Sequence, residues 1–84
     1  MKTNKKLRDQ IFEIINNQIK NNDPPETTLT YNRLINEGFN EFQTMQMIGQ
    51  CIAAELFDVI KLKKPYDEAR YIKNLKHLPE EPFD

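Results

Sequence analysis

The side chains that could carry out catalysis are few and scattered. The chain contains a single histidine, His77, a single cysteine, Cys51, and no serine. It has neither a glycine-rich phosphate loop nor a Cys/His metal-ligand spacing. His77 falls at the end of the last predicted helix, where a cation complements the helix dipole, and Cys51 falls on an apolar helix face. We therefore predict a protein that is not an enzyme, with no cofactor and no metal.

Charged residues gather at the ends of the predicted helices. Acidic residues such as Asp67 and Glu68 fall at helix N-termini, where they complement the dipole, and Glu80 and Glu81 fall in a tail. The basic residues that close the third helix and run along the fourth are Lys61, Lys63, Lys64, Arg70, Lys73 and Lys76. Dipole complementation explains this distribution. The alternative is a basic face on a nucleic-acid-binding accessory protein, although the net charge of −1 gives no general attraction to nucleic acid.

The segment from Tyr31 to Gln50 allows two further interpretations. It could form a helix-turn-helix whose second helix carries amides able to read base edges, but Arg33 is its only cation, and phosphate contacts supply most affinity for DNA. Its Gly38-Phe39 turn is superficially similar to the partner-binding loop of ubiquitin-associated domains, which would require an exposed Phe39.

The elements that must position these residues are helices. With 84 residues and only two glycines, the chain predicts one all-α domain, residues 1–84. Helical spacing and proline positions predict a four-helix bundle with helices at about 5–21, 24–37, 41–63 and 67–77, the third being the longest. Residues 79–84 form a loosely ordered acidic tail in this interpretation.

Local signals set the predicted helix ends. Asp23, with Pro24 at the first helical position, predicts the N-cap of the second helix, and Gly38 its C-terminal turn. Asn40 and Gln43 predict a capping box on the third helix, and Asp67 caps the fourth.

The predicted core consists of apolar stripes at helical spacing. From the first two helices it includes Leu7, Ile11, Ile14, Ile15, Ile19, Leu29, Leu34 and Ile35, with Tyr31 beside them. The third helix contributes Phe42, Met45, Ile48, Gly49, Ile52, Leu56, Val59 and Ile60, and the fourth contributes Ala69, Ile72, Leu75 and Leu78, flanked by Tyr66 and Tyr71.

The third helix carries more apolar residues than one contact needs. A second apolar flank consists of Met47, Cys51, Ala54 and Phe57. Whichever of these remain exposed form the predicted interaction surface, and self-association is one way to cover it. Gly49 and Ala53, one turn apart, predict a close approach of another helix, because glycine within a helix costs ~1 kcal/mol relative to alanine.

No stretch of the sequence approaches the roughly 18 apolar residues that a membrane span needs. One cysteine cannot form an internal disulfide, which favours a reducing compartment. We therefore predict a cytoplasmic protein without a membrane partner.

Four segments together resemble a family of small bacterial helical proteins of unassigned function. These segments are IINNQIKNNDPPE (14–26), RLINEGF (33–39), MIG (47–49) and PYDEARYIKNLKHLP (65–79). The resemblance implies histidines in relatives at the positions of Phe12, Phe42 and Gln46, and a glutamate at Asn16. Relatives would open the third helix with His-Glu-x-x-His, which can hold a metal on one helix face.

This chain departs from that pattern at all four positions. Aromatic rings and neutral amides make poor transition-metal ligands, so we predict that packing replaces any site that relatives have. Phe12 and Phe42 are expected to be close together and largely buried, with Asn16 and Gln46 hydrogen-bonded across the same gap. The leading hypothesis is a non-catalytic interaction or accessory module whose partner is itself or another protein. A degenerate metal-site protein is the third alternative, and it would need Glu13, Glu41 or His77 to be brought together.

Overall fold

The computed structural model describes the backbone of residues 2–80 and the side chains of residues 5–80. Four helices form within this range: α1 (Lys2–Asn21), α2 (Pro25–Asn36), α3 (Glu41–Lys61) and α4 (Glu68–His77). They confirm the predicted all-α fold, and α3 is the longest helix. Residues 81–84 of the predicted tail lie outside the described residues.

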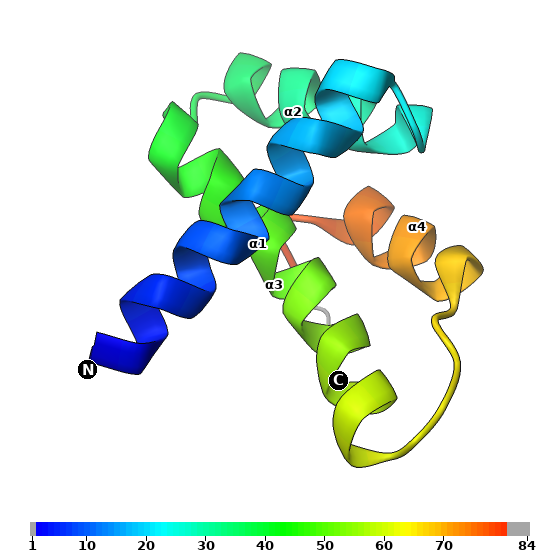
Figure 1. The fold of residues 1–84 in the computed structure, drawn as a ribbon. Coiled ribbons are helices and arrows are strands. Elements are labelled where there is room, and N and C mark those ends of the chain that lie inside the picture. The colour runs from blue at the N-terminus through cyan, green and yellow to red at the C-terminus, as the bar shows by residue number, and fades with distance from the viewer. Residues whose placement is uncertain (1, 81–84) are drawn as a thin grey trace.

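The helices pack as a compact body of 35 × 31 × 28 Å. In Figure 1, α1 crosses over α3 obliquely, so that α1 and α3 each extend beyond the crossing on both sides. Helices α2 and α3 each contact all three others, whereas α1 and α4 lie on different sides of them. The core sits where the four helices converge. Its buried members are Ile11, Ile15, Leu34, Ile48, Cys51, Ile52, Tyr71, Leu75 and Leu78.

The turn between α2 and α3 forms as its sequence predicts. Gly38 has a φ of +107°, a region that favours glycine. The Gly38 N–H donates to the Ile35 carbonyl (3.1 Å), and the Phe39 N–H donates to the Leu34 carbonyl (3.2 Å). These two bonds are the Schellman motif, which satisfies carbonyls at the end of a helix.

The predicted caps of α3 and α4 are also confirmed. The Asn40 side chain accepts from the Gln43 N–H at 2.7 Å, and the Gln43 side chain accepts from the Asn40 N–H at 2.9 Å. The Asp67 carboxylate accepts from the Arg70 N–H at 3.1 Å. The side-chain oxygens of Asn40 and Gln43 are therefore occupied in the cap, whereas bidentate reading of adenine uses both the oxygen and the NH2 group of an amide.

The predicted start of α2 is wrong by one residue. Pro24, not Asp23, is the N-cap, Pro25 is the first helical residue, and no side chain caps this end. The reason is local: a residue that precedes proline is disfavoured in the helical region. Pro24 precedes Pro25 and accordingly adopts φ −77°, ψ 149°.

Several predicted core residues are exposed instead. They are Leu7 and Ile14 on α1, Leu29 on α2, Phe42, Val59 and Ile60 on α3, Ala69 on α4, and the flanking Tyr66. Helical spacing identifies residues that share a face, but a face is buried only where another helix covers it. Leu7 on α1 and Val59 and Ile60 on α3 lie towards helix ends that extend beyond the crossing, whereas Ile14 lies close to the crossing, on a side of α1 that is only partly covered.

Candidate functional site

The predicted interaction surface on α3 is only partly accessible. Cys51 is fully buried, Met47 and Ala54 are partly buried, and Phe57 alone is exposed. Exposed apolar residues continue from Phe57 to the end of the helix. We call this surface the α3-end patch. It consists of Phe57 (53% exposed), Val59 (38%), Ile60 (65%), Leu62 (50%) and, in the following loop, Tyr66 (51%).

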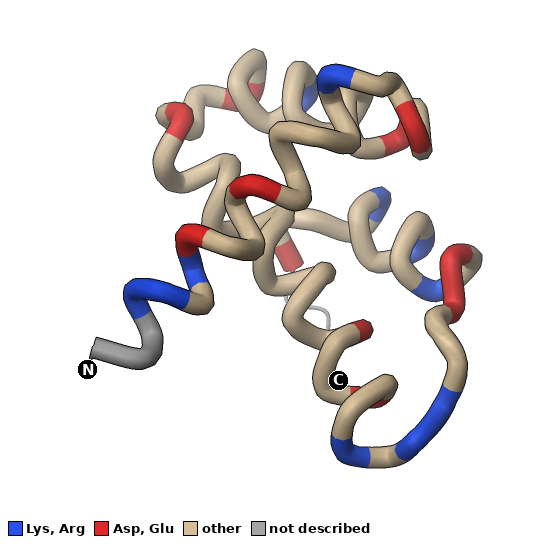
Figure 2. Tube along the Cα trace, in the orientation of Figure 1, with Lys and Arg blue, Asp and Glu red and all other residues tan. Residues whose placement is uncertain are grey.

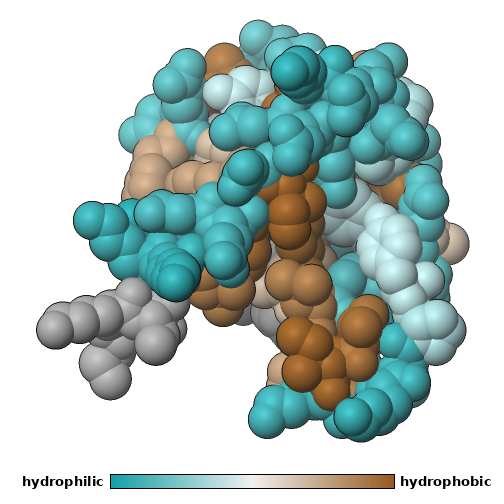
Figure 3. Space-filling view, viewed as in Figure 1, coloured by the Kyte–Doolittle hydropathy of each residue, from teal (hydrophilic) through white to brown (hydrophobic). Residues whose placement is uncertain are grey.

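The α3-end patch surrounds the helix rather than following one stripe. At 100° per residue, Phe57, Val59, Ile60 and Leu62 point in four directions around the axis. Figure 1 shows this end of α3 extending past α1 and α4, and in Figure 3 hydrophobic surface covers the same end of the molecule. Tyr66 lies in the loop after the helix, and with Leu56 it lines a hollow of about 150 Å³.

The predicted basic face loses one of its members to an ion pair. Arg70 donates from Nε to Oε2 of Glu55 at 2.7 Å and from Nη2 to Oε1 of Glu55 at 3.1 Å, and it also pairs with Asp58. The hydrogen bond that Arg70 donates to Glu55, together with the nearby negative charges, raises the pKa of the Arg70 guanidinium. Asp67 also donates its N–H to Glu55, at 3.1 Å. Arg70 therefore binds the start of α4 to α3.

The remaining basic residues form two separate groups. Lys61, Lys63 and Lys64 are exposed at the end of α3, and Lys73 and Lys76 are exposed on α4. Figure 2 shows the acidic residues at the start of α4 between the two groups along the chain.

The positions where relatives would carry histidines lie near the crossing of α1 and α3. The Phe12 and Phe42 rings pack edge to face, with centroids 6.0 Å apart and planes at 75°. Their proximity was predicted correctly, but Phe42 is 48% exposed, so the predicted burial is wrong. Asn16 and Gln46 are both exposed and share no hydrogen bond in the described structure. Both positions lie on the solvent side of this contact, where water satisfies the amides.

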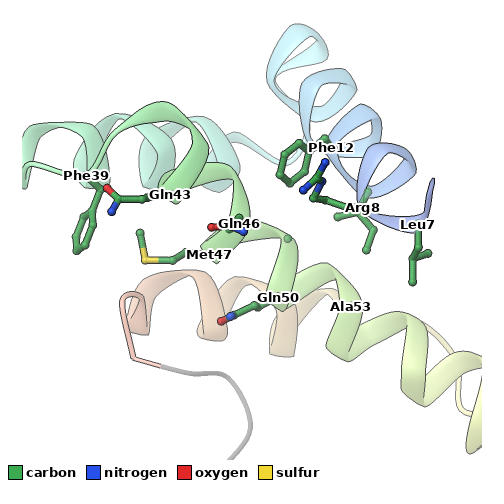
Figure 4. Close-up of a pocket in the computed structure, with 11 residues that line it drawn as sticks. Leu7, Arg8, Phe12, Phe39, Gln43, Gln46, Met47, Gln50 and Ala53 are labelled. Carbon is green, nitrogen blue, oxygen red and sulfur yellow. The ribbon is translucent and has the colours of Figure 1, made fainter. Parts of the chain in front are cut away.

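An open groove runs beside this crossing. It has a volume of about 550 Å³ and is lined by Leu7, Arg8, Ile11, Phe12, Phe39, Gln43, Gln46, Met47, Gly49, Gln50 and Ala53. Figure 4 shows Leu7, Arg8 and Phe12 in a row along α1, and Gln43, Gln46, Met47 and Gln50 along the first half of α3. Phe39, which a ubiquitin-associated surface would expose, is partly buried against the core and lines this groove.

The side chains that could react chemically make structural contacts instead. Burial, with a smaller effect of Glu55, raises the pKa of the Cys51 thiol to about 12. The Tyr71 hydroxyl donates to Gln18 Oε1 at 2.8 Å and lies 3.2 Å from the Thr27 hydroxyl, and burial raises its pKa to about 12. His77 contacts the carbonyl of Lys73 through Nδ1 at 2.9 Å. Across the described residues, no three His, Cys, Asp or Glu side chains are placed to hold one metal ion.

Sequence reasoning missed the polar contacts between helices. Besides Glu55, it missed Arg33, whose guanidinium donates to the carbonyls of Leu75 (3.0 Å) and Leu78 (2.9 Å) at the end of α4. An acid inside the apolar run CIAAELFDVI was the available signal for Glu55. No comparable signal marks Arg33, because its acceptors are backbone atoms.

The fold and these surfaces define a four-helix all-α domain with an exposed apolar helix end and an open groove. No known protein family, curated protein or solved structure matches this chain. The resemblance to small bacterial helical proteins therefore remains a prediction. No helix within residues 2–80 has both the length and the apolar character to cross a membrane.

Proposed function

We propose that this protein is a non-catalytic interaction module and that it associates with a second copy of itself through the α3-end patch. The observation that carries the proposal is the ring of exposed apolar side chains at Phe57, Val59, Ile60 and Leu62. Apolar side chains thus point to several sides of this helix end, with Asp58 and Lys61 between them, and no other helix of the described chain covers the end. A partner is therefore the natural cover. A cytoplasmic location belongs to the same proposal, because the one cysteine cannot form an internal disulfide.

The size of the patch suits an ordinary dimer interface. If each of its five side chains offers about 150–200 Å² when fully exposed, the observed exposed fractions leave on the order of 450 Å². Interfaces are about 60% apolar, so such a patch implies about 750 Å² per partner. That is close to the ~800 Å² per partner of a standard interface.

The charges around the patch favour a second copy over a partner of uniform charge. Lys61, Lys63 and Lys64 lie at the end of α3, and Asp67 and Glu68 lie across the loop at the start of α4. In a two-fold contact, each residue pair occurs twice with the roles exchanged. A surface with a basic side and an acidic side can therefore complement itself.

Sedimentation velocity over a range of protein concentrations tests this proposal with two variants. Ile60→Glu places a charge in the patch, whereas Leu29→Glu places the same charge at an equally exposed leucine on α2 (66% against 65%). We expect a concentration-dependent dimer for the wild type and for Leu29→Glu. For Ile60→Glu we expect the dissociation constant to rise at least about tenfold, because a buried unpaired charge opposes association.

Two outcomes would contradict the proposal. A wild type that stays monomeric at every concentration rules out self-association. A dimer that both variants weaken equally, or that neither weakens, places the interface elsewhere.

A further inference from the structure

The groove between α1 and α3 has the dimensions and lining of a ligand site. Its volume of about 550 Å³ lies within the range of about 300–1,000 Å³ that is usual for small-molecule pockets. Apolar side chains from both helices and from the turn before α3 form most of its lining, including Leu7, Phe12, Phe39 and Met47. Such pockets combine an apolar lining with a few polar groups that orient the ligand.

Among the described residues that line the groove, Arg8 is the only charged one, and aromatic rings hold it in place. Its guanidinium carbon lies 6.0 Å from the centroid of the Phe12 ring and 5.5 Å from that of Phe42. Both distances are within the range of cation–π attraction. The planar donor group is therefore fixed at the groove before any ligand binds.

The hydrogen-bonding capacity of Arg8 is not used within the described residues. Its Nε is buried without a hydrogen-bond partner there, and the nearest carboxylate oxygen, on Asp9, is 3.8 Å away. At that distance Asp9 forms an exposed ion pair with Arg8, which is too long to be a hydrogen bond. The side chain as a whole remains 41% exposed, so a ligand in the groove can reach its terminal nitrogens.

The other polar groups of the groove are amides. Gln43 is engaged in the cap of α3, whereas Gln46 and Gln50 are exposed and donate to no side chain of the described residues. No aspartate or glutamate within residues 5–80 lines the groove. One cation with free amides and no acid is electrostatically complementary to an anion.

We infer that this groove binds a small amphipathic carboxylate, with its apolar body against α1 and α3 and its carboxylate on Arg8. A guanidinium can donate two parallel hydrogen bonds to a carboxylate, which a neutral polar head cannot accept with equal strength. The apolar lining contributes affinity for the body of the ligand, and Arg8 contributes the preference for the anion. This inference is independent of self-association, because the groove lies at the first half of α3 and the α3-end patch at its other end.

Sodium octanoate and 1-octanol are suitable probes because they share an apolar chain and differ in the charge of the head. Each is titrated into isotopically labelled full-length protein, and amide chemical shifts are recorded by NMR. We expect saturable shifts at groove residues and about tenfold tighter binding of octanoate than of octanol, since charge-assisted hydrogen bonds are about twice as strong as neutral ones.

Two charge-removing variants separate the role of Arg8 from a general charge effect. Arg8→Gln should abolish the preference for octanoate while leaving octanol binding unchanged. Lys20→Gln removes the same charge from an exposed position at the other end of α1, and it should keep the preference. Both variants are at solvent-accessible side chains, so folding is checked simply by their circular dichroism spectra.

Three results would overturn the inference: no saturable shifts in the groove, equal binding of the two probes to the wild type, or a preference that survives in Arg8→Gln. Shifts centred on Phe57 and Ile60 would likewise assign the binding to the α3-end patch. Repeating the titration with the Ile60→Glu variant, which disrupts that patch, excludes any contribution of dimerisation to the chemical-shift changes.

Discussion

Replacing Gly49 with alanine tests how closely α1 and α3 approach each other. A Cβ at this position would lie 3.3 Å from Cγ2 of Ile11 and 3.8 Å from Cε1 of Phe12. Alanine gains ~1 kcal/mol over glycine from helix propensity, whereas overpacking a core costs about 1–3 kcal/mol. Ile11 must shift by only a few tenths of an ångström, so the lower end of that range applies. We therefore expect Gly49→Ala to change the free energy of unfolding by between about 0 and −1 kcal/mol.

A double-mutant cycle separates these two opposing effects. Ile11→Leu keeps the side-chain volume but removes the Cγ2 methyl group that the new Cβ would meet. In that background, Gly49→Ala should stabilise the protein by the full ~1 kcal/mol of helix propensity. The coupling energy between the two positions should then be about 1–2 kcal/mol in favour of the double variant.

Urea denaturation followed by far-UV circular dichroism measures each corner of the cycle, with the m-value as a check that the denatured state is unchanged. Gly38→Ala is the matched control. It has nothing within 4 Å of a new Cβ but a φ of +107°, so it should destabilise through backbone strain and show no coupling to Ile11. If Gly49→Ala alone stabilised the protein by the full ~1 kcal/mol without coupling, the close approach of α1 and α3 would be refuted.

Two further predictions concern buried ionisable groups. Burial raises the pKa of Tyr71 to about 12, so Tyr71 ionises in the unfolded chain at a lower pH than in the folded protein. The contribution of Tyr71 to the free energy of unfolding is therefore fully present below about pH 10 and is lost as the pH rises from about 10 to 12. Tyr71→Phe should make this alkaline decrease in the urea midpoint smaller, leaving the part that Cys51 contributes by the same mechanism; an unchanged decrease would contradict the burial argument. Glu55→Gln should lower the urea midpoint more than Asp58→Asn, because Glu55 is nearly fully buried and accepts from both Arg70 and the Asp67 N–H. Equal effects would show that the carboxylate of Glu55 does not hold α4.

The helices were predictable because their ends depend on local chemistry. The Asn40–Gln43 capping box, the Asp67 cap and the Gly38 turn each involve residues that are close in sequence, the farthest pair being Leu34 and Phe39. Such contacts form wherever the helix forms, so the sequence indicates them directly. The error at Pro24 was also local, because the effect of one proline on the residue before it outweighed the cap at Asp23.

The location of the core was less predictable, because it depends on where the helices cross. The α3 stripe is one apolar pattern along the chain, yet Ile48 and Ile52 are buried and Ile60 is 65% exposed. Val59 is separated from Ile48 by about three full turns and so shares its face, yet Val59 is 38% exposed and Ile48 is buried. Only the three-dimensional path of α1 and α4 determines which turns of α3 are covered.

The candidate site was also only partly predictable from the sequence. Phe12 and Phe42 were predicted to meet, and they do, with centroids 6.0 Å apart. The sequence did not indicate that Arg8 lies against both rings, because a cation four residues before Phe12 is an ordinary feature of an exposed helix face. The contact with Phe42 depends on the crossing, and so does the groove beside it.

The two surfaces proposed here share one geometric origin. Because α1 crosses α3 instead of running parallel to it, the turns beyond the crossing keep apolar side chains that no helix within residues 2–80 covers. In a sequence selected only for the stability of the monomer, charges at Phe57 or Ile60 would cost nothing and would protect against aggregation. The chain instead places lysines directly beside the patch, at Lys61, Lys63 and Lys64, and leaves the patch itself apolar. Apolar residues that the fold leaves exposed usually have a functional reason. In this chain such residues are concentrated at the end of α3.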